Sequence, residues 1–508
     1  MKRICGRTVC PSHFSLWLAM VSVAAVLAAT LAARVPHLRA AQKESSKEGE
    51  VEKKKGEQPE GEKAGPAEKE WPYLELTMDN QLRRFRNVTI KAMLRGNENM
   101  TSTFDDFFMK WFFPQFTQRK NLNNMAELRA EMNEYFERAG RNPAATTRLN
   151  NLTLEMMFAL ASGARVAVLR DGQKGTVIRL RSSEDGSSSY QTLTHQPIPT
   201  NLIKETRKAS RDFHPAVKYN AMLLIANLNE QPQTTTKAAV PWQGAFKTLV
   251  LVATYPRAPQ SLRVAALIGL ARHAESTDKT TREIIASNML KILKETSSPD
   301  RSPDGILWIQ RQAVEILAKI GLPGPDGQVL RALGRIVADG DQPLALRAAA
   351  AQAMSKIKPE TLAAKDANAL TRGLSTFLLE ACRYEINGGS SGDQQVSWPR
   401  LAVSLDGVNN ALAVVEAFAG AEEKALSAGM KKSISSLSRN VGSADLSEQR
   451  RKKALQQETV SLARTMGEPE SEDTDPTGEK DETGPTGAQP GTGTAKPQPI
   501  EPPADFPF

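Results

Sequence analysis

The sequence predicts an all-α protein, an α-solenoid in which pairs of helices repeat along the chain. One nine-residue phrase occurs four times in the same helical register, and its central residues are Ala221, Ala266, Ala313 and Ala350. Successive alanines lie 45, 47 and 37 residues apart, which suits a repeat of two helices and about 40–47 residues. A weaker fifth copy is centred on Ala411. The phrase is clear over residues 212–358, and we expect the whole array to span residues 211–466.

Each copy of the phrase begins with an apolar residue, and the alanine follows four residues later on the same face of a helix. The small alanine side chain lets a neighbouring helix backbone approach closely. A cation directly follows the apolar residue in three copies, as Lys218, Arg263 and Arg347, whereas the third copy has Gln310. We expect the stem of each cation to lie along apolar surface while its charged head stays in water.

A proline precedes the phrase by two or three residues in three copies, as Pro215, Pro259 and Pro343. Proline is tolerated at a helix start because its missing N–H needs no partner there. The phrase with its proline resembles the second helix of HEAT repeats, including the bacterial HEAT-like variety. The resemblance implies stacked units that share a core, because one unit cannot bury its apolar face alone. Four unrelated amphipathic helices in an ordinary bundle remain the alternative.

The later copies each follow a candidate first helix, which completes the predicted pairs. These first helices are expected at residues 242–255, 280–296, 328–338 and, for the weaker copy, 364–386. The segment 387–398 is rich in Gly and Ser, so the last pair carries an insertion.

Residues 71–210 are expected to form a helical N-terminal region that lacks the phrase, with helices at 126–140 and 147–161. The aromatic cluster 107–116 is interrupted by Pro114. We expect it to fill a core, since an exposed cluster of this kind would mark an interface. Residues 164–181 contain two alternating runs around Asp171 and Gly172, which predicts a small β-hairpin. The pattern leaves open whether this hairpin is functional or a decoration.

The two ends differ from the middle of the chain in composition. Residues 1–41 are predicted to be a signal peptide or signal-anchor, with a basic start and an uncharged apolar stretch at 14–33. Residues 42–70 are a charged linker, and residues 467–508 are an acidic tail rich in Pro, Gly and Thr. Both are expected to be disordered because they contain too little apolar area to form a core. The predicted location is therefore the cell envelope, exported across or anchored in the cytoplasmic membrane, with the bulk of the chain outside the cytoplasm.

Motifs that carry catalytic, cofactor or metal chemistry were not found, so the sequence predicts no catalytic residue, no cofactor and no metal ligand. Cys382 is expected to be a buried structural thiol, and His214 to cap or pack a helix start. The adjacent carboxylates at 105–106 and 422–423 and the basic run 450–453 are expected to be solvated. The net charge of +9 is spread among many acidic and basic residues rather than gathered on a stripe, which disfavours nucleic acid as a partner.

These features favour a non-catalytic scaffold for protein–protein interaction, which binds an unidentified protein or peptide. The N-terminal segment adds a membrane contact if it is uncleaved. The resemblance leaves two alternatives, because some HEAT-like proteins resemble lyases that attach bilin chromophores and others act on damaged DNA bases. The first is therefore a lyase-like enzyme, although no matching catalytic residue occurs. The second is a nucleic-acid-binding repeat protein.

Overall fold

The computed structural model describes residues 71–468, except 170–173, 183–187, 193–196, 199–202, 209–211, 297–300, 388–395 and 443–445. The chain divides into two units, Met1–Glu70 and Trp71–Phe508, and every described residue belongs to the second. The predicted signal segment, the charged linker and nearly all of the predicted tail therefore lie outside the described residues. The same holds for the predicted turn of the hairpin.

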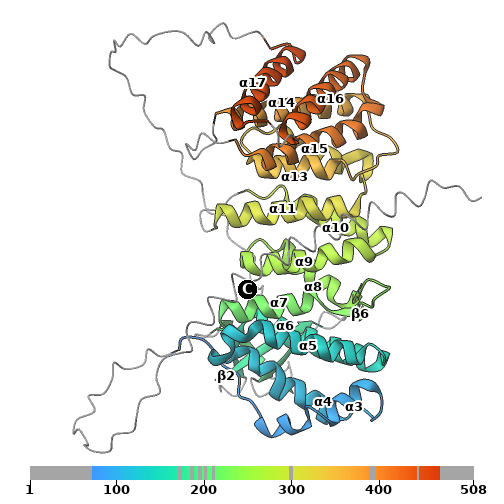
Figure 1. Ribbon diagram of the computed structural model, residues 1–508. Helices are drawn as coiled ribbons and strands as arrows, with labels where there is room; N and C mark the ends of the chain where they lie inside the picture. Colours follow the sequence, from blue (N-terminus) through green and yellow to red (C-terminus); the bar gives the residue numbers. More distant parts are fainter. Residues whose placement is uncertain are drawn as a thin grey trace, which may run out of the picture. The chain divides into compact units, whose positions relative to one another are not determined.

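The described chain is mostly helical. The four copies of the phrase lie on α7 (Pro215–Ala226), α9 (Gln260–Ser276), α11 (Pro303–Ile320) and α13 (Leu344–Met354). Each of these helices packs against the next, and α13 packs against α15 (Trp398–Val415), which carries the weaker copy (Figure 1). The central alanines of all five copies are fully buried, so the phrase forms the inner side of each helix.

A second set of helices lies between the copies of the phrase. These are α8 (Phe246–Thr254), α10 (Lys279–Ile292), α12 (Gln328–Ala338) and α14 (Ala364–Ile386). Each packs on the phrase helix that follows it, and also on the next helix of its own set. The bounds of α12 and α14 are those that the sequence predicts. By contrast, α10 ends four residues early, and the short 3₁₀ turn η7 (Gln243–Ala245) precedes α8.

Glycine allows the closest of these helix contacts. A Cβ atom added at Gly334 on α12 would lie 2.0 Å from Cδ2 of Leu370 on α14. One added at Gly269 on α9 would lie 3.0 Å from Cα of Ala226 on α7. A side chain at Gly334 would therefore displace Leu370, and one at Gly269 would press on the backbone of α7.

The array continues after α15 through the short turn η9 (Glu416–Phe418), α16 (Ala421–Gly442) and α17 (Glu448–Thr465). α17 packs against α14 and α16 and buries Leu455, Thr459 and Leu462. Within the described residues, one helical stretch, Trp398–Phe418, is long and apolar enough to cross a membrane. Its Leu405, Val408 and Leu412 are fully buried, which is how a core helix of the array is packed.

A buried carboxylate fastens the end of α14 to the start of α15. Glu385 is almost fully buried. Its Oε2 accepts a hydrogen bond from the backbone N–H of Ser397 at 2.8 Å, and its Oε1 accepts one from Nε of Arg400 at 2.5 Å. These two hydrogen bonds hold the start of α15 against the end of α14, on either side of the Gly/Ser-rich insertion.

The region before the array is built on the aromatic cluster. The short elements here are η2 (Asn80–Phe85), α3 (Thr89–Arg95), α4 (Ser102–Asp106), the π-helical turn η3 (Phe107–Phe112), η4 (Phe113–Thr117) and η5 (Arg119–Asn124). Two longer helices follow, α5 (Met125–Ala139) and α6 (Pro143–Ser162). Phe108 and Phe112 are fully buried, and each ring centroid lies 5.3 Å from that of Tyr135 on α5. The prediction that this cluster fills a core is confirmed.

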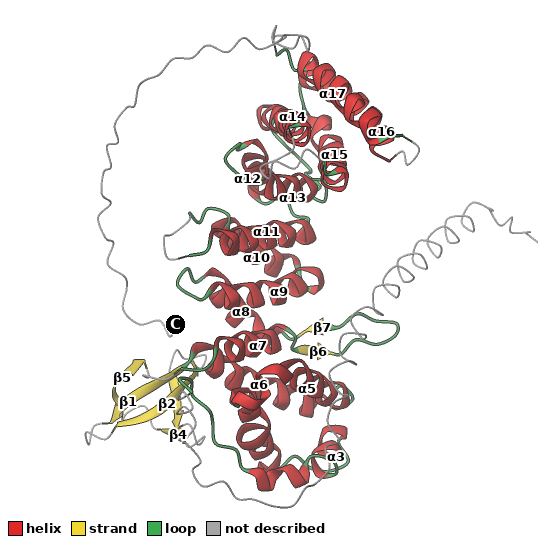
Figure 2. Ribbon diagram, turned by 60° about the vertical axis from the view of Figure 1, so that its left-hand side comes forward, coloured by secondary structure: helices red, strands yellow, loops and turns green. Residues whose placement is uncertain are grey.

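The predicted hairpin region contains a five-stranded antiparallel sheet in the order β4-β3-β2-β1-β5. The strands are β1 (Ala164–Leu169), β2 (Lys174–Ser182), β3 (Ser188–Thr192), β4 (Pro197–Ile198) and β5 (Ile203–Lys208). The element is larger than predicted because β3 and β5 are polar in sequence and lack an alternating apolar pattern. β2 packs against α6 (Figure 2). A second small sheet pairs β6 (Asn229–Gln231) with β7 (Val240–Pro241).

Candidate interaction surface

The cations of the phrase do not keep their heads in water, and this expectation is corrected. Arg263 is 0% exposed. Its Nε donates to the carbonyl of Ala253 in the last turn of α8 at 2.8 Å. Its two terminal nitrogens each donate to an oxygen of Glu295, just beyond α10, at 2.7 Å. The guanidinium thus joins three successive helices.

Arg347 repeats this arrangement two copies later. Its Nε donates to the carbonyl of Val337 in the last turn of α12 at 2.8 Å. Its Nη1 pairs with Glu380 on α14 at 2.5 Å, and its guanidinium lies 5.0 Å from the ring centre of Phe377. The last carbonyls of a helix have no partner within the helix and carry partial negative charge. They bind a buried guanidinium in place of water, which the apolar environment excludes.

The other two copies use weaker versions of the same contact. Gln310 donates from Nε2 to the carbonyl of Glu295 at 3.3 Å, so it satisfies the carbonyl without a charge. Lys218 pairs with Asp212, upstream of its own helix, at 2.6 Å, and its side chain is mostly buried. The head of Lys218 is therefore also taken out of bulk water.

The three prolines lie at the starts of the phrase helices. Pro215 is the first residue of α7, and His214 caps this helix by accepting a hydrogen bond at Nδ1 from the N–H of Ala216 at 3.1 Å. Pro259 and Pro343 lie one residue before α9 and α13, and their carbonyls accept the first helical N–H bonds. Each proline therefore sets the direction in which a phrase helix begins.

Two contacts fix how α9 and α11 lie beside each other. A Cβ atom at Gly305 would lie 2.4 Å from Oε1 of Gln260, and Nζ of Lys319 lies 2.6 Å from Oε1 of Glu275. The first contact is at the start of both helices and the second is near the end of both. The two helices therefore run in the same direction, and this register places Trp308 of α11 beside Val264 of α9.

The outer face of these two helices carries an apolar patch. Trp308 is 42% exposed, and Val264, Ile268 and Leu307 beside it are partly buried. We call these four residues the Trp308 patch. The pattern of the phrase does not reveal this patch, because Trp308 lies outside the phrase, directly before its third copy.

The nearest charges to Trp308 on α11 are one helical turn away on either side. Arg311 pairs with Glu315 at 3.2 Å, and Asp304 is exposed. An exposed indole in such surroundings is typical of the anchor residues of protein interfaces, which are enriched in Trp. The other large apolar side chains that are exposed among the described residues are Val88, Leu251, Ile284, Val403 and Val460, and each lies on a different element. Single exposed apolar residues of this kind are ordinary.

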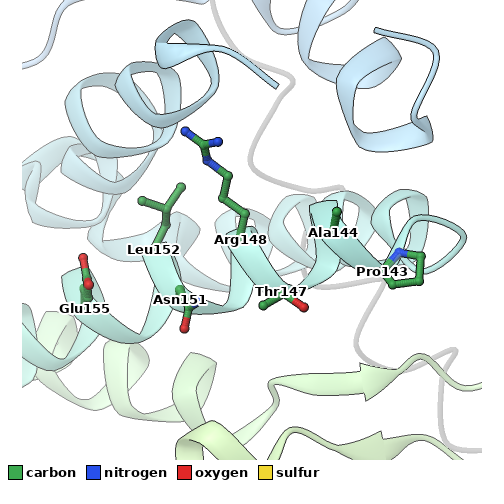
Figure 3. Close-up of a pocket in the computed structure, with 7 residues that line it drawn as sticks. All are labelled: Pro143, Ala144, Thr147, Arg148, Asn151, Leu152 and Glu155. Atoms are coloured by element: carbon green, nitrogen blue, oxygen red, sulfur yellow. The ribbon is translucent and has the colours of Figure 1, made fainter. Parts of the chain in front are cut away.

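A shallow hollow follows one side of α6 and is lined by Pro143, Ala144, Thr147, Arg148, Asn151, Leu152 and Glu155 (Figure 3). Arg148 binds both oxygens of Asp105, at 2.6 and 2.7 Å. Desolvation by the surrounding residues and the Asp105 carboxylate raise the pKa of Glu155, although its side chain is still exposed to solvent. Asp105 already neutralises the guanidinium of Arg148. The lining of the hollow therefore contains one carboxylate, that of Glu155, and no second group that could exchange a proton with it.

Two carboxylates expected to be solvated are paired instead. Asp105 holds Arg148, and Glu423 is nearly fully buried and accepts from Arg372 at 2.9 Å. Adjacent carboxylates on a helix point apart, and Glu423 is the one that turns inward to its cation. Asp105 is still 36% exposed in its pair with Arg148, so the expectation is wrong for Glu423.

The remaining reactive side chains are buried. Cys382 is fully buried, as predicted, and burial raises the pKa of its thiol to about 12, so the reactive thiolate is not formed at neutral pH. Among the residues that the structure describes, no group of three or more His, Cys, Asp or Glu side chains could hold a metal ion.

His273 on α9 makes stability depend on pH. It is almost fully buried, and burial, followed by the nearby Arg272, lowers the pKa of its imidazole to about 4. The unfolded chain binds this proton near pH 6.5, so the contribution of the neutral imidazole is complete above pH 6.5 and is lost as the pH falls towards 4. We expect a loss of about 2–3 kcal/mol between pH 7.5 and 4.5, measured by urea unfolding.

The matched variant is His273→Leu, which cannot bind a proton. Its stability should fall by correspondingly less between the two pH values than that of the parent protein. Equal losses in both proteins would show that other groups carry the acid sensitivity.

No protein-family model matches the chain, and no curated protein matches it in sequence.

Proposed function

We propose that this chain is a HEAT-like α-solenoid that acts as a non-catalytic scaffold for a protein or peptide partner. The apolar stretch 14–33, with basic residues before it, supports export or attachment to the cytoplasmic membrane. On this proposal the array lies in the cell envelope and presents its phrase helices as the binding surface.

The order of helix contacts supports the solenoid. Each phrase helix packs on the next phrase helix, and each intervening helix packs on the phrase helix that follows it. The guanidinium contacts of Arg263 and Arg347 recur at equivalent positions and tie one pair to the next. Contacts between successive units are what stabilise a repeat protein.

The Trp308 patch is the observation that carries the binding role. It lies on two neighbouring phrase helices and combines an exposed indole with partly buried apolar side chains. Burying an indole against a partner removes a large apolar area from water, and truncating such an anchor costs 2 kcal/mol or more at typical interface centres.

The test is capture of a partner from envelope extracts with the full chain carrying Trp308→Ser, compared with the parent protein. We expect the parent to capture a saturable partner, and the variant to bind it at least tenfold more weakly. Val460→Ser, on α17, removes an exposed apolar residue outside the patch and should bind as the parent does. The absence of a saturable partner, or equal binding by Trp308→Ser, would contradict the proposal.

A further inference from the structure

We propose that a polar cavity between α3 and α5 binds a short neutral saccharide. The cavity has a volume of about 480 Å³ and lies wholly in the region before the array. The inference therefore goes beyond the proposed function and does not depend on the Trp308 patch.

Amide side chains dominate the wall of this cavity. The four amides come from three places in the chain, directly before α3, in η4 and in η5: Asn87, Gln115, Asn121 and Asn124. An amide offers N–H donors and a carbonyl acceptor, and a sugar hydroxyl likewise donates and accepts. Pockets for apolar ligands are instead lined mainly by hydrophobic and aromatic side chains. The wall therefore suits a ligand that carries many hydroxyl groups.

One of these amides has a donor that the protein leaves unpaired. Nε2 of Gln115 is buried and has no hydrogen-bond partner among the residues that the structure describes. An unpaired buried donor is unfavourable, and nearly all such groups in folded proteins are paired. The last torsion of a glutamine side chain is broad, so a small rotation brings this amide to a ligand in the cavity. The backbone carbonyl of Gln115 meanwhile accepts from Nδ2 of Asn121 at 2.9 Å.

A fixed carboxylate forms another part of the wall. Oε1 of Glu131 lies 2.7 Å from Nε of Arg86 and accepts from the hydroxyl of Tyr135 at 2.6 Å. Burial and the hydrogen bond to Glu131 raise the pKa of Tyr135, so its hydroxyl stays protonated at neutral pH. The Tyr135 ring is held from behind by the aromatic cluster. Both contacts use Oε1, which leaves Oε2 of Glu131 to accept from a ligand hydroxyl.

The charges of the wall favour a neutral ligand. The carboxylates of Glu127, Glu131 and Glu134 outnumber the cations of Arg86 and Lys91. A phosphate or a sugar acid would therefore meet more negative than positive charge. The two cations, in turn, oppose a positively charged ligand. A neutral sugar avoids both penalties and uses the hydrogen-bonding groups that remain.

The experiment titrates the full chain by calorimetry with neutral disaccharides of glucose, mannose, galactose and N-acetylglucosamine. At least one of them should bind saturably, with a dissociation constant of about 1 mM or tighter. Gln115→Met keeps the length of the side chain and removes the amide, so it should weaken binding about tenfold. It should not lower the midpoint of thermal unfolding, because the donor that it removes is unpaired in the parent protein.

Two further variants complete the comparison. Asn124→Ala removes an exposed amide of the wall and should weaken binding about threefold. The matched control is Asn133→Ala, because Asn133 is an exposed amide on α5 that does not line the cavity. This control should bind the sugar as the parent protein does. Circular dichroism establishes that the helices of each variant are intact.

Three outcomes would overturn the inference. They are the absence of saturable binding by all four disaccharides, binding that neither Gln115→Met nor Asn124→Ala weakens, and equally tight binding of acetylated, amidated triglycine. The last result would show that the cavity takes peptide amides rather than sugars. Trp308→Ser should bind the sugar as the parent does, so failure of this inference and failure of the proposed function are measured separately.

Discussion

Replacement of Arg263 by alanine is expected to lower the free energy of unfolding by about 3–5 kcal/mol, because it leaves a buried charge without its partner. The variant would leave the carbonyl of Ala253 without this donor, and it would leave Glu295 with only its longer pairing to Arg301 at 3.6 Å. Urea unfolding followed by circular dichroism measures the loss. Hydrogen exchange should place it in α8, α9 and α10, since repeat arrays can open locally.

Two control variants distinguish the effect of losing the ion pair from the effect of losing side-chain volume. Gln310→Ala removes one neutral hydrogen bond to Glu295 and should cost only about 0.5–1.5 kcal/mol. The pair Arg263→Met with Glu295→Leu replaces both charges by apolar groups and should recover most of the loss. If Arg263→Ala lowered the free energy of unfolding by less than about 1 kcal/mol, the guanidinium of Arg263 in the parent protein would be solvated by water rather than by the protein.

Replacement of Phe112 by alanine is expected to destabilise the N-terminal region by about 3–5 kcal/mol through the cavity that it leaves. The ring is fully buried, and its centroid lies 5.3–6.3 Å from those of Phe108, Trp111, Phe113, Phe116 and Tyr135. So many neighbours cannot all move into the space of one lost ring. Thermal unfolding of the full chain, followed by tryptophan fluorescence, reports on Trp111 beside the cavity.

The matched control for Phe112→Ala is Val88→Ala, because Val88 belongs to the same region and is highly exposed. Its substitution should change stability by no more than about 0.5 kcal/mol. If Phe112→Ala were equally mild, the aromatic cluster would not be the core of this region.

The helices between residues 246 and 415 were largely predictable because local rules and helix packing agree there. The bounds of α12 and α14 follow from apolar positions at helical spacing. The prolines mark the starts of α7, α9 and α13 because a missing N–H has no cost at those positions. By contrast, β3 and β5 contain too few apolar residues for periodicity to reveal them, since strands of this kind form by pairing with their neighbours rather than by burying one face.

The predictions failed where a tertiary contact decides the role of a side chain. In the sequence, a cation one residue from a buried position is expected to reach water. In the packed helices, a backbone carbonyl and a glutamate bind the guanidinium groups of Arg263 and Arg347 instead of water. The Trp308 patch was missed for a related reason. Its four residues come from two phrase helices, and only the register between α9 and α11 brings them together.

The carboxylate of Glu385 has a consequence for how this protein tolerates changes in length. It holds Ser397 and Arg400 at the end of α14, so the two ends of the Gly/Ser-rich insertion stay together whatever number of residues joins them. In general, doubling the length of a segment that joins two fixed ends adds only about 0.6 kcal/mol of closure entropy. This junction is therefore the place in the array where a whole additional domain could be inserted at little thermodynamic cost.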